Sequence, residues 1–237
     1  MPTDAAFDFD GSVALVTGAS GALGSAVVEY LNDAGATVAA TDLVAPDDED
    51  ALLDPGAADF YEADFTDEDD VRETVEAVVA EHGRLDQLCN VAGTWRGGTP
   101  IDETEADEFD FLLDVNLKTM FLACKHAVPH LREADGAIVS VSARASLEGG
   151  EGDGPYRAAK AGVRILTETI AAENQGEVRA NAVMPSVIDT PANREMMPDA
   201  DHDEWVDPEE IAGVTAFLLS DAAAPTSGAA VPVYGEA

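Results

Sequence analysis

Short apolar runs alternate with longer amphipathic stretches along the whole chain, and this alternation restricts the fold more than any other feature. The segments 13–16, 37–40 and 137–141 are short and mostly apolar, as in buried strands. The stretches 25–32 and 71–81 have helical spacing of apolar residues. Such an order favours a doubly wound parallel sheet with helices on both faces, an α/β fold. Further strands are expected at 85–91 and 180–183, and helices near 105–131, 156–174 and 208–220.

The length of the chain favours one domain. Its 237 residues are enough for a complete α/β sheet and its core, and we find neither an internal repeat nor a linker. We therefore expect a single domain over residues 1–237. The segment 186–207, which is rich in Pro, Met, Asp and Asn, interrupts the alternation and is expected to form a mobile loop or lid over the substrate.

Acidic residues dominate the charge. The chain has 48 Asp and Glu against 12 Lys and Arg, a formal net charge of −36, yet 46% of its residues are hydrophobic, so it should fold. Nucleic acids and anionic membranes are poor partners, because contacts with phosphate need clustered basic side chains. An acid excess spread over the whole chain is typical of a surface adapted to molar salt, where self-repulsion is screened. We expect the cytoplasm of a salt-loving organism.

Other features agree with a cytoplasmic location. The N-terminus is acidic where a secretion signal is positively charged, and no apolar run approaches the length of a membrane span. Cys89 and Cys124 lie in apolar stretches and are expected to be free, buried thiols. The four histidines lack metal-ligand spacing with one another or with the cysteines, so no metal is expected.

A glycine-rich turn follows the first expected strand and opens the first helix. In the segment 17–24, Thr-Gly-Ala-Ser-Gly-Ala-Leu-Gly, glycines let backbone N–H groups approach a pyrophosphate. Asp42, at the end of the second strand, is placed to accept hydrogen bonds from the adenosine ribose. Its carboxylate would repel the 2′-phosphate of NADP, and no basic residue lies nearby, so NAD(H) is favoured. The alternative is a purely structural turn with a solvated Asp42.

Tyr156 and Lys160 are four residues apart, so on a helix both side chains project from one face. A phenol with a pKa near 10 is a poor acid or base at neutral pH, but a neighbouring ammonium and an oxidised nicotinamide would favour the phenolate. The pair follows the expected strand 138–142 closely enough for the two segments to converge on a cofactor. The alternative is an ordinary exposed helical pair.

Taken together, these motifs resemble the short-chain dehydrogenase/reductase family from about residue 11 to residue 235. The resemblance rests on Thr17-Gly18 with Gly24, Asp42, Asp64, Asn90-Val91-Ala92-Gly93, Asn116, Tyr156 with Lys160, and Pro185 with Ile188 and Thr190. It implies a single-domain Rossmann fold that binds NAD. It also implies a homodimer or homotetramer, because the segment 226–235 resembles the family's last strand, which commonly supports assembly.

The resemblance implies a role for each matching residue. Tyr156 would be the acid or base, Lys160 would lower its pKa and hold the nicotinamide ribose, and Asn116 would position a water that links Lys160 to solvent. Asp64 and Phe65 would border the adenine, Asn90, Ala92 and Gly93 would lie under the adenine ribose, and Ile188 and Thr190 would take the carboxamide. The full expected cofactor-binding set is Gly18, Ser20, Gly21, Ala22, Leu23, Gly24, Asp42, Leu43, Asp64, Phe65, Asn90, Ala92, Gly93, Tyr156, Lys160, Pro185, Val187, Ile188 and Thr190.

Three positions depart from the family's pattern. Ala22 stands where the glycine turn usually has Gly, and Pro185-Ser186 replaces the usual Pro-Gly. Most important, Ala143 stands thirteen residues before Tyr156, where the family has its catalytic serine. Ser142 could replace that serine only with a local bulge, because neighbouring residues of a strand face opposite ways.

The quinonoid dihydropteridine reductases, a subgroup of the family, also lack this serine. The segments 21–25, 143–147 and 189–205 are similar to that subgroup, through shared substrate or shared ancestry. The main prediction is an NAD-dependent dehydrogenase or reductase that transfers hydride between nicotinamide and a small carbonyl or alcohol substrate. One alternative is a dihydropteridine reductase-like enzyme. The other is an NAD(H)-binding regulator without catalysis, for which Ala143 is the support.

Overall fold

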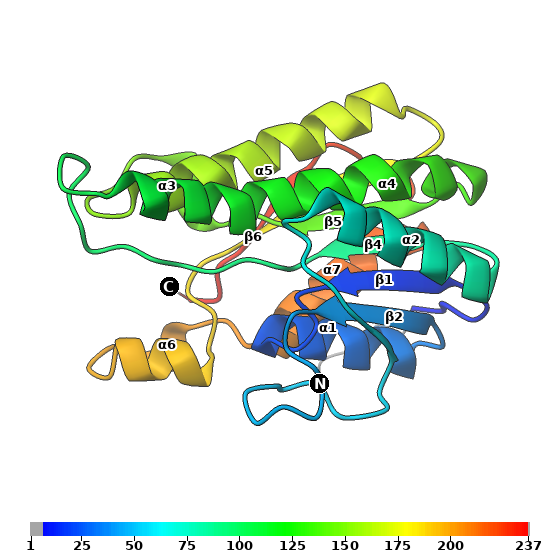
Figure 1. Cartoon of the computed structure of the whole chain (residues 1–237), viewed down its shortest axis with the longest axis horizontal. Coiled ribbons are helices and arrows are strands. Elements are labelled where there is room, and N and C mark those ends of the chain that lie inside the picture. Colours follow the sequence, from blue (N-terminus) through cyan, green and yellow to red (C-terminus); the bar gives the residue numbers. More distant parts are fainter. Residues whose placement is uncertain (1–6, 237) are drawn as a thin grey trace.

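The computed structural model describes residues 7–236 as one domain built on a seven-stranded parallel sheet (Figure 1). The strand order is β3-β2-β1-β4-β5-β6-β7, so the direction of winding reverses between β1 and β4. The strands are β1 (Val13–Thr17), β2 (Thr37–Asp42), β3 (Asp59–Glu62), β4 (Gln87–Asn90), β5 (Ala137–Val141), β6 (Arg179–Pro185) and β7 (Ala230–Val233).

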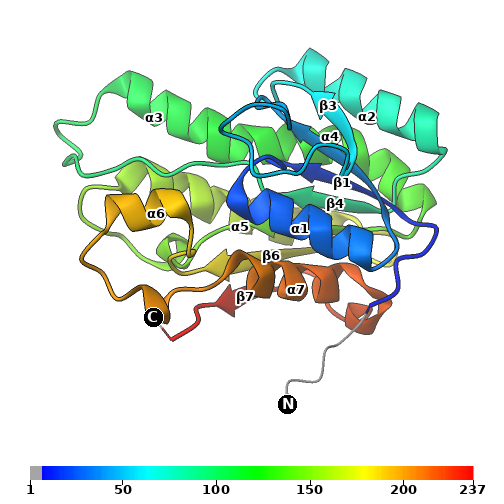
Figure 2. The same cartoon turned by 90° about the horizontal axis from the view of Figure 1, so that it is seen from below.

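Seven α-helices are found among the described residues, and they divide between the two faces of the sheet. They are α1 (Ala22–Asp33), α2 (Glu68–His82), α3 (Ala106–Leu113), α4 (Thr119–Glu133), α5 (Gly154–Glu173), α6 (Pro191–Met196) and α7 (Pro208–Leu219). Helices α1 and α7 lie side by side on one face, and α2, α4 and α5 cover the other (Figures 1 and 2). The doubly wound architecture expected from the sequence is confirmed.

Strand β1 shows how the alternation of side chains builds two cores. Val16 packs in the cluster beneath α1 and α7, whereas its neighbour Leu15 packs in the cluster beneath α2 and α4. Both side chains are fully buried. A central parallel strand has no solvent face, which is why the run 13–16 is apolar throughout.

Acidic residues begin several helices, where carboxylates satisfy free backbone N–H groups. Asp67 caps α2 by accepting from the amides of Asp69 and Asp70. Asp207 and Glu210 form a capping box at the start of α7. Part of the acid excess therefore serves the helices directly, since negative charge is also favourable at helix N-termini.

The structure refines the expected elements in three places. Strand β3 was not predicted; it is short, lies at the sheet edge and is only partly buried. The expected helix 105–131 is divided by a π-helical turn, Asp114–Lys118, which joins α3 to α4. The segment 186–207 is not a plain loop, because it contains α6 and a short 3₁₀ helix, His202–Glu204.

The structure tests only part of what we expect about the location of the protein. No helix within residues 7–236 combines the length and apolar character needed to cross a membrane. The acidic segment on which the expected absence of a secretion signal rests begins at residue 1, and its first six residues lie outside the described part.

Asp86 and Lys160 are the only charged residues that are buried in the described part of the chain. Asp86 lies just before β4, and its carboxylate accepts a hydrogen bond of 2.9 Å from the Val13 amide at the start of β1. Arg84 donates to the same carboxylate over 2.7 Å. Asp86 therefore fixes the register of the two central strands at their amino ends.

Replacing Asp86 by Ala should lower the free energy of unfolding by about 2 kcal/mol, because the buried Val13 amide loses its acceptor. Urea unfolding in molar KCl measures the change. Asp47→Ala, at an exposed position, is the control and should change stability by less than about 0.5 kcal/mol. Equal stability of the two variants would contradict this role for Asp86.

Candidate active site

The candidate site lies at the carboxyl ends of β1 and β4, where the strand order reverses. In open parallel sheets this crevice is the usual ligand site, because connections leave it in opposite directions. Thr17 ends β1, and its hydroxyl accepts from the amides of Val91 and Ala92, both at 3.2 Å. The ends of the two strands are thereby fixed to each other beside the glycine turn.

The glycine turn is packed too tightly for side chains at two positions. Gly18 has φ +67°, and a Cβ there would lie 2.7 Å from the backbone of Ala92. A Cβ on Gly24 would overlap the Gly18 carbonyl. Gly21 is the N-cap of α1 and provides no side-chain cap, so no side chain covers the first turn of that helix. Ala22 is its first residue, and a methyl group is accommodated there.

Asp42 lies directly against this turn. One oxygen of its carboxylate accepts from the Ser20 amide at 3.0 Å, and the other accepts from the amides of Leu43 and Val44. Leu43 is 64% exposed beside it. This arrangement joins the end of β2 to the glycine turn, as a shared dinucleotide site requires.

The residues after β3 form a second part of this edge. Asp64 is half-buried, and one of its oxygens accepts from both the amide and the hydroxyl of Thr66. Phe65 is buried in the core beneath α2. On β4, the Asn90 amide donates to Ser140 at 3.0 Å, so its side chain is held within the sheet.

The side chains of Asn116 and Lys160 meet at Gly93, just beyond the end of β4. A Cβ on Gly93 would lie 2.7 Å from Oδ1 of Asn116 and 2.9 Å from Nζ of Lys160, so only glycine fits between them. Lys160 is 5% exposed, and its ammonium donates to the Val141 carbonyl at 3.0 Å. Burial lowers the pKa of Lys160 to about 8.

Tyr156 lies one helical turn before Lys160 on α5. The Lys160 nitrogen is 6.0 Å from the centre of the Tyr156 ring. Burial, with a smaller contribution from the Asp153 carboxylate, raises the pKa of Tyr156 to about 12, and Arg157 opposes the rise. The protein alone thus holds Tyr156 as a neutral phenol at neutral pH.

Asn116 is positioned by the π-helical turn between α3 and α4. Its side chain donates to the carbonyls of Thr94 and Leu112 and accepts from the Thr94 amide at 3.1 Å. Asn116 is 1% exposed. Because a π turn shifts the hydrogen-bond register of a helix, such turns are common at functional sites. Here the side chain of Asn116 joins the π turn to the loop that follows β4.

Ser142 and Ala143 follow directly after the end of β5. Ser142 is buried, and its hydroxyl donates to the Lys160 carbonyl at 2.8 Å. Its amide donates to Val183 on β6. The hydroxyl is therefore directed at the backbone of α5, an arrangement that does not favour Ser142 as a donor to substrate. Ala143 follows with no polar group on its side chain.

The segment after β6 faces the glycine turn across a cleft of about 370 Å³. Pro185 ends β6, Ile188 pairs with Val206, and Thr190 caps α6. Val187 accepts from the Val206 amide, which closes the base of the segment. The cleft is lined by Ala22, Ser25, Leu52, Asp189, Thr190, Pro191, Arg194, Asp207, Pro208 and Glu209.

Sequence reasoning missed the Asp153–Arg157 pair. Arg157 bonds Asp153 at 2.5 Å and donates to the carbonyls of Ala145 and Glu148. It thereby holds the loop that connects β5 to Tyr156. The spacing of four residues between opposite charges was the available signal.

Comparison with known proteins agrees with this geometry. The family described as enoyl-(acyl carrier protein) reductase matches residues 18–235. A 3-oxoacyl-(acyl-carrier-protein) reductase of Thermotoga maritima is 35% identical over 95% of this chain and 97% of its own. A meso-2,3-butanediol dehydrogenase of Serratia marcescens is 33% identical over 97% and 95%.

Solved structures are similar over the same extent. A short-chain dehydrogenase/reductase from Brucella melitensis, described as glucose/ribitol dehydrogenase, superposes with a TM-score of 0.88 and 30% identity, covering 98% of both chains. The ligand-free aldohexose dehydrogenase of Thermoplasma acidophilum gives a TM-score of 0.87 with 28% identity over 97% of this chain and 95% of that one. The chain belongs to the short-chain dehydrogenase/reductase family of oxidoreductases.

Proposed function

We propose that the protein is an NAD(H)-dependent oxidoreductase that transfers hydride between nicotinamide and a small carbonyl or alcohol substrate. The observation that carries this proposal is the meeting of Lys160, Asn116 and Gly93 at the end of β4, one helical turn from Tyr156. A structural role alone does not require a buried ammonium beside a half-buried phenol. The names of the relatives, a 3-oxoacyl reductase and a butanediol dehydrogenase, support a carbonyl or alcohol as substrate.

The residues of the glycine turn fit a dinucleotide. The absence of side chains at Gly18 and Gly21 leaves the backbone amides at the start of α1 open to a pyrophosphate. Asp42 would bind the adenosine ribose, and no Arg or Lys occurs in 17–24 or 42–45 to neutralise a 2′-phosphate. We therefore propose NAD(H) rather than NADP(H).

Tyr156 would transfer the proton that accompanies hydride transfer. In reduction its hydroxyl donates to the substrate oxygen, and in oxidation its phenolate accepts that proton. When bound, the nicotinamide supplies or accepts the hydride, and its oxidised ring adds a positive charge. The pKa of Tyr156 in the protein alone is about 12, so this charge and the Lys160 ammonium must act together to lower it.

Lys160 and Asn116 would complete the path of the proton. The Lys160 ammonium lies against the end of β4, where it would hold the nicotinamide ribose. Asn116, fixed by Thr94 and Leu112, would position the water through which Lys160 reaches solvent. Ile188 and Thr190 would hold the carboxamide from the segment across the cleft.

A pterin is the second candidate substrate, and it is favoured by one observation. Ala143 provides no donor to a developing oxyanion, and the Ser142 hydroxyl donates to the backbone carbonyl of Lys160. Loss of such a donor typically costs about 10²–10³ in rate where it is essential. A quinonoid dihydropterin would not need this donor, because the bond that is reduced in it is a C=N bond.

Solution properties follow from the charge and the surface. We expect a cytoplasmic protein that works in molar salt, because self-repulsion at a net charge of −36 is then screened. We also expect a homodimer or homotetramer. Phe121 on α4 and Ile165 on α5 are 49% and 48% exposed, which gives the outer helices apolar positions that a second copy could cover.

NADH oxidation in molar KCl with quinonoid dihydropterin, ketones, aldehydes and 3-oxoacyl thioesters tests the proposal, with Tyr156→Phe as the variant. Loss of the phenol should reduce kcat by about 10²-fold or more and leave the affinity for NADH nearly unchanged. Tyr30→Phe on α1 is the matched control and should keep its activity. Binding of NADH without turnover of any substrate would identify a regulator instead.

Replacing Asp42 by Ser should reduce the preference for NADH over NADPH by about 10-fold or more, because the 2′-phosphate no longer meets a carboxylate. Ratios of kcat/KM for the two cofactors measure the change. Asp50→Ser, at an exposed position beyond β2, should leave the ratio as it is. An unchanged ratio in the Asp42 variant would mean that this carboxylate does not contact the ribose.

Replacing Lys160 by Met should remove activity and yet stabilise the fold. The pKa of Lys160 falls from 10.5 to about 8 on burial, so the unfolded chain binds the extra proton between these pH values and stability rises with pH across that window. Below pH 8 the buried ammonium costs about 3 kcal/mol. After loss of the bond to Val141, the variant should gain about 2 kcal/mol at pH 7.

Urea unfolding of both proteins at pH 7 and at pH 10.5 measures this difference. The advantage of the Lys160→Met variant should shrink toward zero at the higher pH, where the folded lysine is neutral and the unfolded lysine is about half protonated. A variant that is less stable than the native protein at pH 7 would contradict the cost assigned to the buried ammonium.

A further inference from the structure

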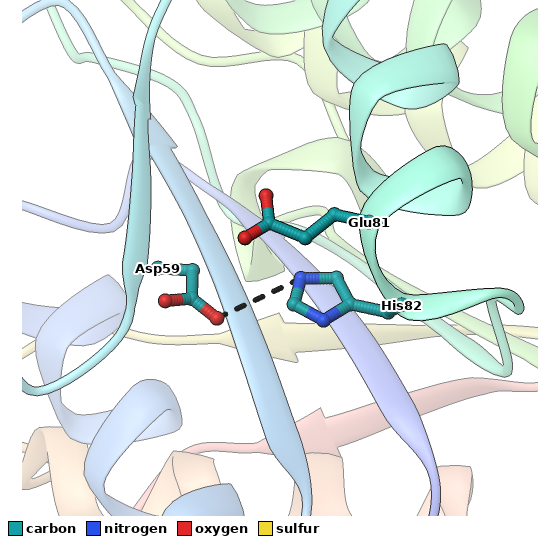
Figure 3. Close-up of side chains that lie close together, drawn as sticks. All are labelled: Asp59, Glu81 and His82. Atoms are coloured by element: carbon teal, nitrogen blue, oxygen red, sulfur yellow. Dashed lines mark ion pairs between the residues drawn. The ribbon is translucent and has the colours of Figure 1, made fainter.

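Three potential metal ligands, Asp59, Glu81 and His82, lie close together (Figure 3), at the edge of the sheet that β3 forms. Asp59 is the first residue of edge strand β3, and Glu81 and His82 are in the last turn of α2. Their ligand atoms all lie within 4.8 Å of one another. Asp59 is at the amino end of its strand, whereas Tyr156 lies near the carboxyl ends of the parallel strands. The cluster is therefore at the other end of the strands from Tyr156.

The imidazole of His82 is placed like a ligand rather than a hydrogen-bonded side chain. Its ring is 12% exposed, and its Nε2 atom is buried without a hydrogen-bond partner among the described residues. This nitrogen faces Oδ2 of Asp59 at 3.6 Å, too far for a hydrogen bond. With bonds of about 2.1 Å, that separation gives an angle of about 118° at a shared metal, close to tetrahedral.

Glu81 is oriented by a second-layer hydrogen bond. The Tyr61 hydroxyl donates to one oxygen of Glu81 at 2.7 Å, which leaves the other oxygen for a metal. Ligating carboxylates in metal sites are commonly held by such outer partners.

We propose that Asp59, Glu81 and His82 bind one divalent transition-metal ion of the zinc type, with water completing the coordination. One imidazole with two carboxylates suits Zn²⁺ better than Mg²⁺ or Ca²⁺, which prefer oxygen ligands alone. The exposed Glu81 side chain supplies the movement that brings its oxygen to bonding distance. The ion would connect β3, which is bonded to the sheet on one side only, to α2.

A second histidine shows what distinguishes this cluster. Nε2 of His126 is also buried without a hydrogen bond and faces a carboxylate, that of Glu68, at 3.4 Å. The same carboxylate already pairs with the Lys125 ammonium, and no second carboxylate joins it. An ammonium in place of the third ligand excludes a cation, so the pair of His126 with Glu68 serves as the natural control.

The sequence gives little sign of this site, because the histidines lack ligand spacing along the chain. Asp59 is 23 residues from His82, and only the packing of α2 beside β3 brings the two together. Since the ligands come from two elements, ion binding would oppose separation of the edge strand. The expected effect is on stability, with hydride transfer unaffected.

The test uses the full-length protein in molar KCl after treatment with a chelator. Zn²⁺ is added as the chloride, and binding is followed by calorimetry and by the midpoint of thermal unfolding. The variants are His82→Gln and Asp59→Asn, with His126→Gln as the matched control. Asp59 is 55% exposed, so its variant should fold even if His82→Gln does not.

We expect one Zn²⁺ per chain and a rise in Tm of about 5 °C at a hundredfold excess over Kd. Both site variants should lose the rise, and His126→Gln should keep it. NADH binding by Asp59→Asn should equal that of the native protein. No rise in the native protein, or an equal rise in Asp59→Asn, would overturn the proposal and assign the ion to the general acidic surface.

Discussion

The close approach of two backbones at the centre of the sheet controls the rest of the site. Gly18 passes so near Ala92 that any side chain would strike the backbone of β4's extension, and the Thr17 hydroxyl fixes the two segments at 3.2 Å. This contact sets where α1 begins and, through Gly93, where Asn116 and Lys160 can meet. The turn therefore positions the proposed cofactor-binding residues and the proposed catalytic residues together.

Much of the fold could be predicted from the sequence because central parallel strands are buried on both faces. Runs such as 13–16 and 137–141 are apolar for that reason and stand out from their surroundings. Strand β3 was missed because an edge strand of four residues has little apolar content to mark it. The π-helical turn at Asn116 was also missed, since a change of hydrogen-bond register leaves the apolar period almost unaltered.

The sequence predicts on which elements the residues of the candidate site lie. It does not predict as well in which direction their side chains point. Glycine spacing and the separation of Tyr156 from Lys160 fix positions on known elements, which is why those residues do converge. The direction of the Ser142 hydroxyl depends instead on the packing of α5 against β5. That hydroxyl donates to the Lys160 backbone carbonyl, and Ala143 beside it has no polar side-chain group, so neither residue could be given a donor role from the sequence.

Lys160 shows how function and stability are opposed in an acidic protein. The other two lysines, Lys118 and Lys125, lie at the surface and pair with carboxylates, as expected where acids are four times as numerous as bases. Lys160 instead is buried, its ammonium donates to the Val141 carbonyl, and no carboxylate within the described residues offsets its desolvation. A neutral side chain of similar length would satisfy the packing of α5 at lower cost. The fold therefore gives no reason for an ammonium at this position, which is why we propose a role for Lys160 in the chemistry at the end of β4.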